Sequence, residues 1–413
     1  MNTKRIMRWV IVLFLLAALP GLTAVRAQGQ ALANQIPEEQ GSDWGPACTR
    51  NENEPNDTRN SADPVVFGDV ICGEMHEVGG PNDCEDYDLD YFKFTLPNSR
   101  IILLKAYIGL VDMGIWLYDQ NGQHIVTLRD YDETVYLNLP AGDYYIHTGL
   151  IYNDAWCSSH YSFVLASPLL VSAAAANLGT GTVAGIPFRS EDILAYAPLS
   201  NGEDYWQMFF DGSDVGVKTV TNVAWDSGNR ILVTTGGNQT LPGVGAVTPW
   251  DIVIFEPESY GENTAGTFRM GLDGSEHQLT TSGEKLDAIA TSQYCTFLST
   301  TGTATVPYYM GYNIKFKDED LGCWYADDEW LYGFESRKVT GLPVEDVFAA
   351  AYDEAADKMY LTILGSGKIA GHKVTQKDIF VINYPAYTWG GVVWHGPDHG
   401  WNYNIDAIEL NGW

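Results

Sequence analysis

The chain has 413 residues, 45% of them hydrophobic, and a formal net charge of −30 at neutral pH. Such an acidic surface repels nucleic acid phosphates and anionic lipid, so the composition argues against nucleic acid as a partner. A chain of this length is expected to form two domains, each large enough to bury a core. The charge suits divalent cations, although most of the carboxylates are expected only to keep the protein dispersed.

Residues 1–27 have the pattern of a secretory signal peptide. Basic residues precede an apolar run at residues 9–19, and Val25-Arg-Ala27 provides a small-residue cleavage site. The run is too short to span a bilayer, and Pro20-Gly21 interrupts it. We therefore predict a secreted, extracellular protein with no membrane span in its mature form. Residues 28–47 are polar and are expected to form a flexible leader.

Residues 48–167 contain short alternating strands separated by turns, and no helical period. Tyr91–Leu96, Ile101–Ile108 and Tyr161–Leu165 are examples of these strands. Gln120-Asn-Gly122 and Pro140-Ala-Gly142 supply residue types that tolerate tight reversals. The pattern predicts a β-sandwich of ordinary size.

Four motifs occur in order along this segment: Glu54-Pro-Asn-Asp57, Asp88-Leu-Asp-Tyr-Phe92, Asp112–Gly122 and Leu139–Ile146. Together they resemble the bacterial pre-peptidase C-terminal (PPC) domain, a jelly-roll-like sandwich found on secreted proteases and other exported proteins. The resemblance covers about 120 of the 413 residues. The segment departs from the family because no peptidase precedes it and because an acidic, Gly-rich insertion separates Cys72 from Cys84.

The resemblance implies a calcium site, since related domains bind calcium through an E-x-E-x-N segment and later aspartates. The residues that match are Glu52, Glu54, Asn56, Asp57, Asp86, Asp88 and Asp90. Calcium takes six to eight oxygen ligands, and alternate positions of an extended chain project on one side. Asp57 fits less well because its side chain suits a cap on its own turn. The alternative is that Asp86–Asp90 is a solvated acidic turn.

The resemblance suggests a stabilising, processing or adhesive module. Aromatic residues of this segment are candidates for a ligand-binding face: Tyr107, Trp116, Tyr118, Tyr152 and Trp156. About half of such aromatics are expected to point into the core of a sandwich instead.

Residues 168–413 contain an internal repeat. Asp251-Ile-Val-Ile-Phe-Glu-Pro257 recurs in altered form from Asp192, Asp320 and Asp378, with steps of 59, 69 and 58 residues (251−192, 320−251, 378−320). Because an acid stands at the same place in each copy, we interpret it as a structural residue that bonds backbone amides at each corner.

Each repeat offers four short strands, which is the content of one propeller blade. The first copy begins at its second strand, Leu169, and an additional first strand follows at Asn404–Leu410. The sequence therefore predicts an all-β chain: a jelly-roll-like sandwich followed by a four-bladed propeller closed by the C-terminal strand. A pair of packed β-sandwiches, each holding two repeats, is the alternative.

All six cysteines follow the signal peptide, and an even count outside the cytoplasm argues for disulfides. The absence of a CxxC pair disfavours a zinc ribbon or a thioredoxin-like site. Cys295 and Cys323 fall on neighbouring strands of one repeat, so we expect them to pair. The expected bridges in the sandwich are then Cys72–Cys84 and Cys48–Cys157.

The segment that most resembles a metal or acid–base site is Trp394–Trp401, which contains His395, Asp398 and His399. His395 stands where Asp211, Asp273 and Glu335 stand in the other repeats, so we favour a divergent turn. HExxH, GxSxG and P-loop patterns do not occur, and we predict no catalytic residue.

The leading hypothesis is a monomeric, calcium-stabilised protein that binds an extracellular polysaccharide or protein. The aromatic residues of the repeats expected to contribute lie around Tyr308-Tyr309, Trp389, Trp394 and Trp401. One alternative is an extracellular hydrolase or lyase with its site at the mouth of the propeller channel. Another is a structural envelope component.

Overall fold

The computed structural model describes residues 45–75, 89–108, 113–129, 132–150, 159–174, 180–226, 228–308, 311–325 and 329–410. Within these ranges the chain is all-β, as expected: strands are joined by turns and by short 3-10 segments, with no α-helix. The 3-10 segments are Gly274–His277, Ser282–Glu284, Ser336–Lys338, Leu342–Val344 and Gly396–His399. No helix in the described ranges is long and apolar enough to cross a membrane.

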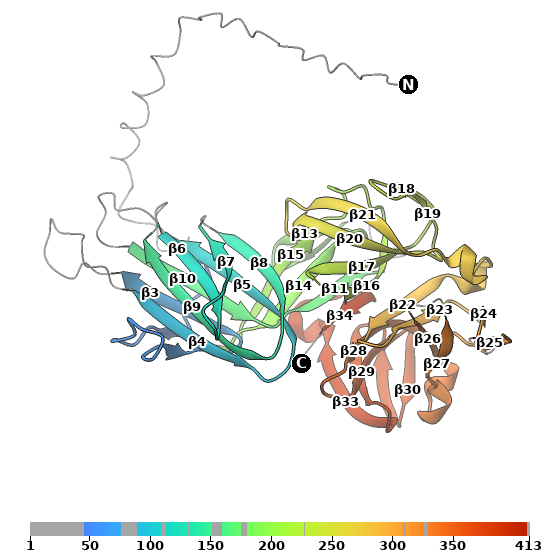
Figure 1. Ribbon diagram of the computed structural model, residues 1–413. Helices are drawn as coiled ribbons and strands as arrows, with labels where there is room; N and C mark the ends of the chain where they lie inside the picture. The colour runs from blue at the N-terminus through green and yellow to red at the C-terminus, as the bar shows by residue number, and fades with distance from the viewer. Residues whose placement is uncertain are drawn as a thin grey trace, which may run out of the picture. The chain divides into compact units, whose positions relative to one another are not determined.

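Residues 50–166 form two five-stranded sheets (Figure 1). The first, which we call the β3 sheet, has the order β1 (Arg50–Asn51), β3 (Asp69–Met75), β10 (Ser159–Ala166), β5 (Arg100–Ile108) and β8 (Glu133–Leu139). The second, the β4 sheet, has the order β2 (Asp63–Pro64), β4 (Asp90–Leu96), β9 (Gly142–Leu150), β6 (Met113–Asp119) and β7 (His124–Leu128).

The core of this sandwich follows from the period of the strands. Strand β4 buries every second side chain, and Phe92 and Phe94 meet Phe163 of β10 between the two sheets. Strand β5 differs, because nearly all of its residues are buried. Its apolar run Ile101-Ile-Leu-Leu104 is typical of a strand that is covered on both faces.

The second cover of the β3 sheet comes from the repeat region. Val164, on the outer side of β10, shares an apolar core with Phe209 of the first repeat. Nearby, the Tyr107 hydroxyl lies 3.3 Å from the Tyr205 hydroxyl. Tyr107 is therefore buried, and the suggestion that it lines a ligand-binding face is wrong.

Residues 169–409 form four antiparallel four-stranded sheets, which we name by their innermost strands. The β34 sheet has the order β15 (Asp204–Phe210), β14 (Ile193–Pro198), β11 (Leu169–Ala173), β34 (Ile405–Glu409). The β16 sheet holds β16 (Val220–Asp226), β17 (Arg230–Thr235), β20 (Ile252–Ser259) and β21 (Ala265–Leu272). The β22 sheet holds β22 (Leu286–Thr291), β23 (Thr296–Thr300), β26 (Leu321–Trp324) and β27 (Trp330–Phe334). The β28 sheet holds β28 (Val347–Asp353), β29 (Lys358–Ile363), β32 (Asp378–Asn383) and β33 (Thr388–His395).

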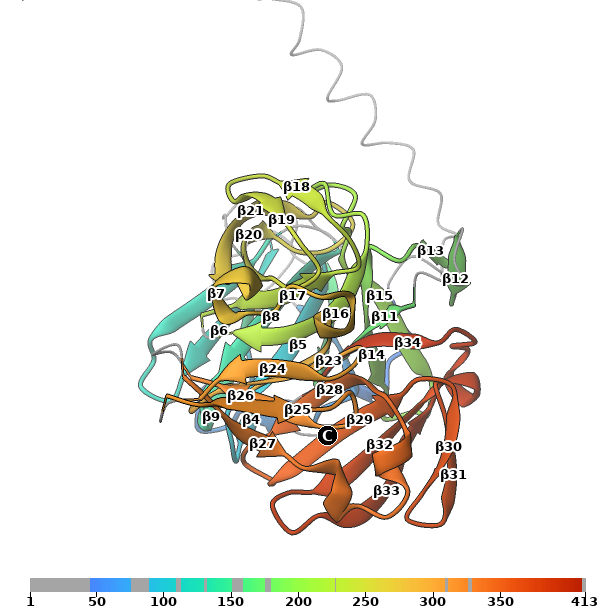
Figure 2. The ribbon, with the colours of Figure 1, turned by 90° about the vertical axis from the view of Figure 1, so that its right-hand side faces the viewer.

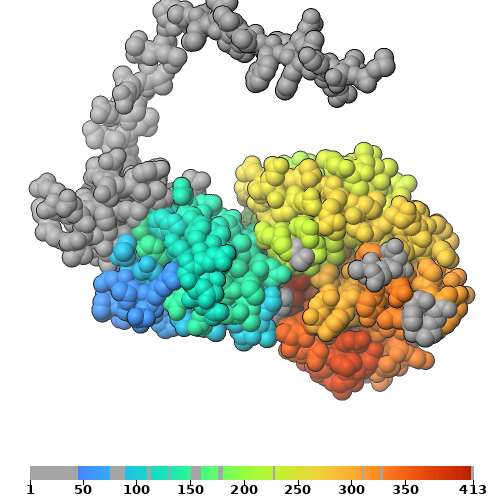
Figure 3. All heavy atoms as spheres, in the orientation of Figure 1, coloured from blue at the N-terminus to red at the C-terminus, as the bar shows by residue number. Residues whose placement is uncertain are grey.

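The four inner strands contact one another in cyclic order: β34 meets β16, β16 meets β22, β22 meets β28, and β28 meets β34 (Figure 2). Four apolar cores separate the sheets, one for each neighbouring pair. On the face shown in Figure 3, side chains of the sheets from β16 onward lie in close contact. The last strand pairs with β11, with Leu170 opposite Glu409, so it completes the sheet of the first repeat, as the offset of the copies predicted.

The repeated aspartates hold the corners of these sheets. In each repeat one carboxylate oxygen accepts a hydrogen bond from the backbone N–H three residues earlier, at 2.8 Å for Asp192, 2.8 Å for Asp251, 3.4 Å for Asp320 and 2.7 Å for Asp378. The other oxygen accepts from the turn after the fourth strand, at Gly212, Gly274 and Ser336. This confirms the structural role of the repeated acid. In the fourth repeat the His395 side chain takes the place of the turn amide.

A small hairpin that the sequence did not predict stands between the second and third strands of every sheet. These hairpins are β12 (Gly181–Val183) with β13 (Ile186–Phe188), β18 (Gln239–Leu241) with β19 (Gly245–Val247), β24 (Ala304–Pro307) with β25 (Asn313–Phe316), and β30 (Ser366–Ile369) with β31 (His372–Thr375). In the second repeat the loop Leu241-Pro-Gly-Val-Gly245 forms the turn of this hairpin. Gly243 has φ +85°, and a Cβ there would lie 2.6 Å from the Phe268 carbonyl oxygen, so the turn requires glycine.

Candidate functional site

Three acids of the sandwich converge. Glu52, Glu54 and Asp90 each place a carboxylate oxygen within 4.8 Å of the other two. Asp90 is fully buried, Glu52 is half-buried and Glu54 is exposed, so the group is open on one side. In the part of the chain that the structure describes, no other group of three acids, histidines or cysteines converges in this way.

A two-residue strand positions the first of these acids. Strand β1 runs parallel to β3, with Asn51 opposite Cys72, and the Cys48–Cys72 disulfide joins the same two segments. The Glu52 N–H then donates to the Cys72 carbonyl at 3.0 Å, and the Glu74 N–H donates to Glu52 Oε1 at 2.8 Å. These bonds fix Glu52 at the end of β1, where its other oxygen faces Asp90.

A single hydroxyl bridges two of the carboxylates. Tyr161 Oη lies 2.6 Å from Glu52 Oε2 and 2.7 Å from Asp90 Oδ2. Because a phenol has one proton, it donates to only one of them at a time. Burial, followed by the charges of Asp90 and Glu52, raises the pKa of Tyr161 well above its usual range. The hydroxyl therefore stays neutral and does not itself offset the negative charge of the group.

Asn56 lies beside the acids. Its side chain is fully buried, and neither its Oδ1 nor its Nδ2 has a hydrogen-bond partner. Its backbone N–H donates to Glu54 Oε2 at 3.1 Å, which holds it next to the group. Burying an unpaired amide costs about 1–3 kcal/mol. A bound cation that took Oδ1 as a ligand would reduce this cost, so the donor set fits a hard cation such as calcium.

The structure brings together four of the seven residues expected to bind calcium. Glu52, Glu54 and Asp90 form the group and Asn56 lies beside it. Asp57 is exposed and does not belong to the converging group. Asp86 and Asp88 lie outside the described residues.

The disulfides of the sandwich differ from the expectation. Cys48 pairs with Cys72, so the predicted bridges Cys72–Cys84 and Cys48–Cys157 are both wrong. The physical reason is the parallel pairing of β1 with β3, which places the two cysteine Cα atoms 5.7 Å apart. Cys84 and Cys157 lie outside the described residues.

Aromatic side chains gather on the outer face of the β4 sheet. Trp116 of β6 stacks on His147 of β9, with ring centroids 5.2 Å apart, and Tyr91 of β4 stacks on the other side of His147 at 4.6 Å. Tyr118 lies two residues along β6, and the Arg59 guanidinium sits 5.2 Å from the centre of its ring. All four rings are half-buried. The predicted candidates Trp116 and Tyr118 are thus part of one partly exposed aromatic row.

The other predicted ligand-binding aromatics do not share this setting. Trp394 is 2% exposed and Trp401 is fully buried, and both belong to the core between the β28 and β34 sheets. Trp401 stacks on Trp206 at 5.7 Å. The prediction that Trp394 and Trp401 bind ligand is therefore wrong, because their rings fill space between sheets. Tyr152, Trp156 and Tyr309 lie outside the described residues.

The two histidines near these tryptophans have separate partners. His395 Nδ1 bonds Asp378, whereas His399 Nδ1 lies 3.0 Å from Asp204 Oδ1 and 2.9 Å from the Tyr196 hydroxyl. His395 thus acts at a corner of its repeat, which agrees with its interpretation as a divergent turn.

A cleft of about 860 Å³ opens where the inner strands end. Trp225, Trp324 and Tyr352 contribute aromatic walls, and Glu409, the last residue of β34, lines it too. Burial raises the pKa of Glu409 to about 8, although the Trp225 N–H donates to its Oε2 at 2.9 Å. Glu409 therefore carries its proton at neutral pH.

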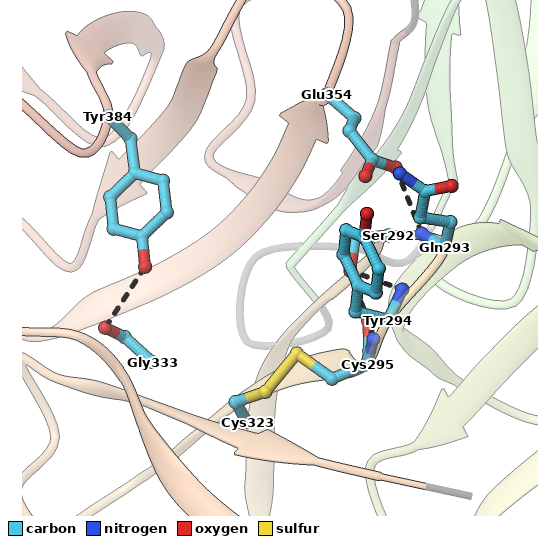
Figure 4. Close-up of a disulfide and its surroundings, with 8 residues drawn as sticks. All are labelled: Ser292, Gln293, Tyr294, Cys295, Cys323, Gly333, Glu354 and Tyr384. Carbon is cyan, nitrogen blue, oxygen red and sulfur yellow. Dashed lines mark hydrogen bonds between the residues drawn. A yellow bond between two sulfur atoms is a disulfide. The ribbon is translucent and has the colours of Figure 1, made fainter.

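The Cys295–Cys323 disulfide is present, as expected, and lies near one edge of this cleft; Figure 4 shows the disulfide and its surroundings. Ser292 and Gln293 line the cleft, and the turn that they begin leads to Cys295. The Cys295 N–H donates to Ser292 Oγ at 3.0 Å, and the Gln293 N–H donates to Glu354 Oε2 at 2.9 Å. The turn is thus tied to both the β22 and the β28 sheets.

Tyr161 and Glu409 were not found by sequence reasoning. Tyr161 is 109 residues from Glu52 and looks like any other core residue of a strand. Glu409 carried only a weak signal, since it is one of two acids, with Asp406, in the strand expected at Asn404–Leu410.

No protein-family profile matches the sequence, and no curated protein matches it. A solved structure that is similar is the pre-peptidase C-terminal domain of a collagenase from Bacillus anthracis, at 16% identity and a TM-score of 0.21. The match covers 28% of this chain and 99% of that chain.

Proposed function

We propose that the chain is a secreted, calcium-stabilised protein that binds an extracellular polysaccharide or protein. The observation that carries the proposal is the convergence of Glu52, Glu54 and Asp90 beside the unpartnered amide of Asn56. The signal-like residues 1–27, which lie outside the described ranges, and the two disulfides support export.

In this proposal the sandwich is a PPC-like module and the four-stranded sheets are the blades of a propeller. The cyclic contacts of the inner strands support a ring, as do the four cores between neighbouring sheets. Strand β34 closes the ring by hydrogen bonding to β11, so β11 is not left as the inner edge of its sheet. Two separate sandwiches would leave two of the four neighbouring pairs without a core.

Calcium titration calorimetry on protein freed of metal by chelation tests the first part. We expect Glu52→Gln to weaken binding tenfold or more, a change of about 1.4 kcal/mol or above, because it removes a charged ligand. Asp57→Asn is the matched control and is expected to bind as the wild type does, because Asp57 stands outside the group. Absence of calcium binding, together with a melting temperature that excess chelator does not change, would contradict the proposal.

The partner is sought on arrays of glycans and extracellular polymers, with and without calcium. The row of Tyr91, Trp116, Tyr118 and His147 offers flat faces for stacking, so Tyr118→Ala should weaken binding. Tyr332, an exposed residue of β27, gives the matched control Tyr332→Ala. Equal losses in the two variants, or no binding at all, would argue against the row as the binding face.

A second candidate function is a hydrolase or lyase, and the cleft at the end of the inner strands favours it. A buried carboxyl that keeps its proton at neutral pH can donate it to a leaving group, and Glu409 has this property beside Trp225 and Trp324. Product release from a polymer on the array, abolished by Glu409→Gln and kept by the exposed control Glu258→Gln, would establish this function instead. Binding without product would dismiss it.

A further inference from the structure

The inner strands share an irregularity near their first residues. The pairing of each with its neighbour shifts by one residue, between Val220 and Asn222, between Leu286 and Ala288, between Val347 and Ala349, and between Ile405 and Ala407. The extra residues are Thr221, Asp287, Phe348 and Asp406. A bulge of this kind re-aims a side chain away from the regular ladder.

The four bulge residues line one cavity. Its volume is about 300 Å³, and Thr221, Asp287, Phe348 and Asp406 all contribute to its wall. The cavity lies at the starts of the inner strands, whereas the cleft beside Glu409 lies at their ends. Each of the four sheets thus contributes its bulge residue to the wall of the same cavity.

This register also changes the interpretation of the repeat. An acid or amide stands before a small apolar run near the start of each inner strand, at Asn222, Asp287, Asp346 and Asp406, and these residues look equivalent in sequence. Only Asp287 and Asp406 occupy the bulge, because Asn222 follows it by one residue and Asp346 precedes β28. Two of the four inner strands, β22 and β34, therefore offer a carboxylate to the cavity.

Asp287 has an unusual setting for an acid. It is 3% exposed, neither of its oxygens is within hydrogen-bond distance of a donor, and the Ser299 hydroxyl and the Asp346 carboxyl lie nearby. Burial, followed by the nearby Asp346 carboxylate, raises the pKa of Asp287 well above its usual range. Lys285 lines the same cavity, but no ion pair joins its ammonium group to the Asp287 carboxylate. A buried acid without a partner is costly when ionised unless a cation accompanies it.

The other residues that line the cavity indicate which kind of cation it would bind. Ala174, Pro249, Leu286 and Phe348 give the cavity apolar surface, alongside four threonines. Calcium needs six to eight oxygen ligands, and the one convergent group of three acids among the described residues is in the sandwich. A cavity of this size is at the lower end of small-molecule sites, which run from about 300 Å³ upward.

We propose that this cavity binds a small organic cation, a primary ammonium group carried on an apolar body, with Asp287 as its carboxylate partner. The ammonium supplies the charge and the donors that Asp287 lacks. The apolar body lies against Phe348 and Leu286. The site is independent of the calcium group and of the aromatic row.

Titration calorimetry with n-butylammonium tests the proposal, with n-butanol as the neutral probe. We expect the wild type to bind n-butylammonium at least tenfold more tightly than n-butanol. Asp287→Asn keeps the shape of the side chain and is expected to lose at least tenfold in affinity for the ammonium. Glu258→Gln removes the same charge from an exposed site of β20 and is expected to change nothing.

A second variant distinguishes a specific change in the site from a general loss of folding. Phe348→Ala removes the apolar wall from a half-buried position, so it should weaken n-butylammonium binding and leave methylammonium binding unchanged. Four results would overturn the proposal: no binding of n-butylammonium, equal binding of n-butanol, an Asp287→Asn variant with wild-type affinity, or displacement of n-butylammonium by calcium. The last result would identify a metal site in its place.

Discussion

The sandwich and the four sheets place the same residue types in opposite environments. Glu52 and Glu54 of the sandwich converge on an open side, whereas Asp287 and Glu409 of the inner strands are buried and have raised pKa values. Tryptophans follow the same division. Trp116 lies on a half-open face, and Trp401 has no exposed surface.

The difference shows what decides the chemistry of a carboxyl group in this chain. Where acids meet with access to solvent, their oxygens suit a metal cation. Where an acid is enclosed by the inner strands, burial disfavours the charged form and raises the pKa, unless a cation accompanies the carboxylate. Residue type alone does not separate the two cases, because register and burial determine them.

The largest expected effect concerns the tryptophans. Trp401→Ala empties space between Phe188 and Trp206, on which the ring stacks, and is expected to lower the free energy of unfolding by about 3–5 kcal/mol. Chemical denaturation measures it. The half-buried Trp389 of β33 gives the control Trp389→Ala, with a smaller loss. Equal losses would show that Trp401 is not a core residue.

Glu409 is expected to make stability fall as pH rises. Its folded pKa of about 8 exceeds the ordinary value, so the stability that it contributes is fully present below the ordinary carboxyl pKa and is lost as pH rises through about 8. Since one pKa unit corresponds to about 1.4 kcal/mol, the loss amounts to a few kcal/mol. Denaturation of wild type and Glu409→Gln across this range should show a flatter profile in the variant. If the stability of both proteins changes with pH in the same way, Glu409 is not the group that binds the proton.

Trp116→Ala is expected to cost only about 1 kcal/mol or less, because the ring is already partly exposed. Its clearer effect is on His147, on which it stacks. Burial, followed by the charge of Arg59, lowers the pKa of His147 to about 4, and removal of the indole should raise it. Titration of the imidazole signals by NMR measures the change. A pKa that stays near 4 would mean that other neighbours bury the ring.

The smallest effect is expected from Asp57→Asn. Asp57 is exposed and has no place in the converging group, so melting temperatures with and without calcium should match those of the wild type. A calcium-dependent decrease would restore Asp57 as a ligand and would extend the site toward solvent.

Much of the scaffold could be predicted because its signals are local or periodic. The acid at Asp192, Asp251, Asp320 and Asp378 recurs, and its hydrogen bonds lie within a few residues or one strand pair. The offset of the copies predicted the pairing of the last strand with β11. Glu52 and Glu54 stand at alternate positions of a motif, so their proximity also followed from local sequence.

The remainder depends on contacts that sequence spacing does not encode. The Cys48–Cys72 bridge depends on a parallel pairing of only two residues, which carries no pattern of its own. Tyr161 reaches the acids from a distant strand. The bulge at Asp287 shifts the register by one residue, and a periodic alignment passes over it. The sequence around Trp394 and Trp401 does not indicate whether their side chains face solvent or a neighbouring sheet.

The pairing of Leu170 with Glu409 spans 239 residues (409−170) and sets the order in which the chain can mature. Strands β11, β14 and β15 precede β34 in the chain, so their sheet stays one strand short until residues 405–409 are available to pair. Pairings this distant form slowly, because the loop between them must close first. Until then β11 presents a bare edge that other chains can join. The acidic charge of the chain, −30 at neutral pH, opposes such pairing between neighbouring copies.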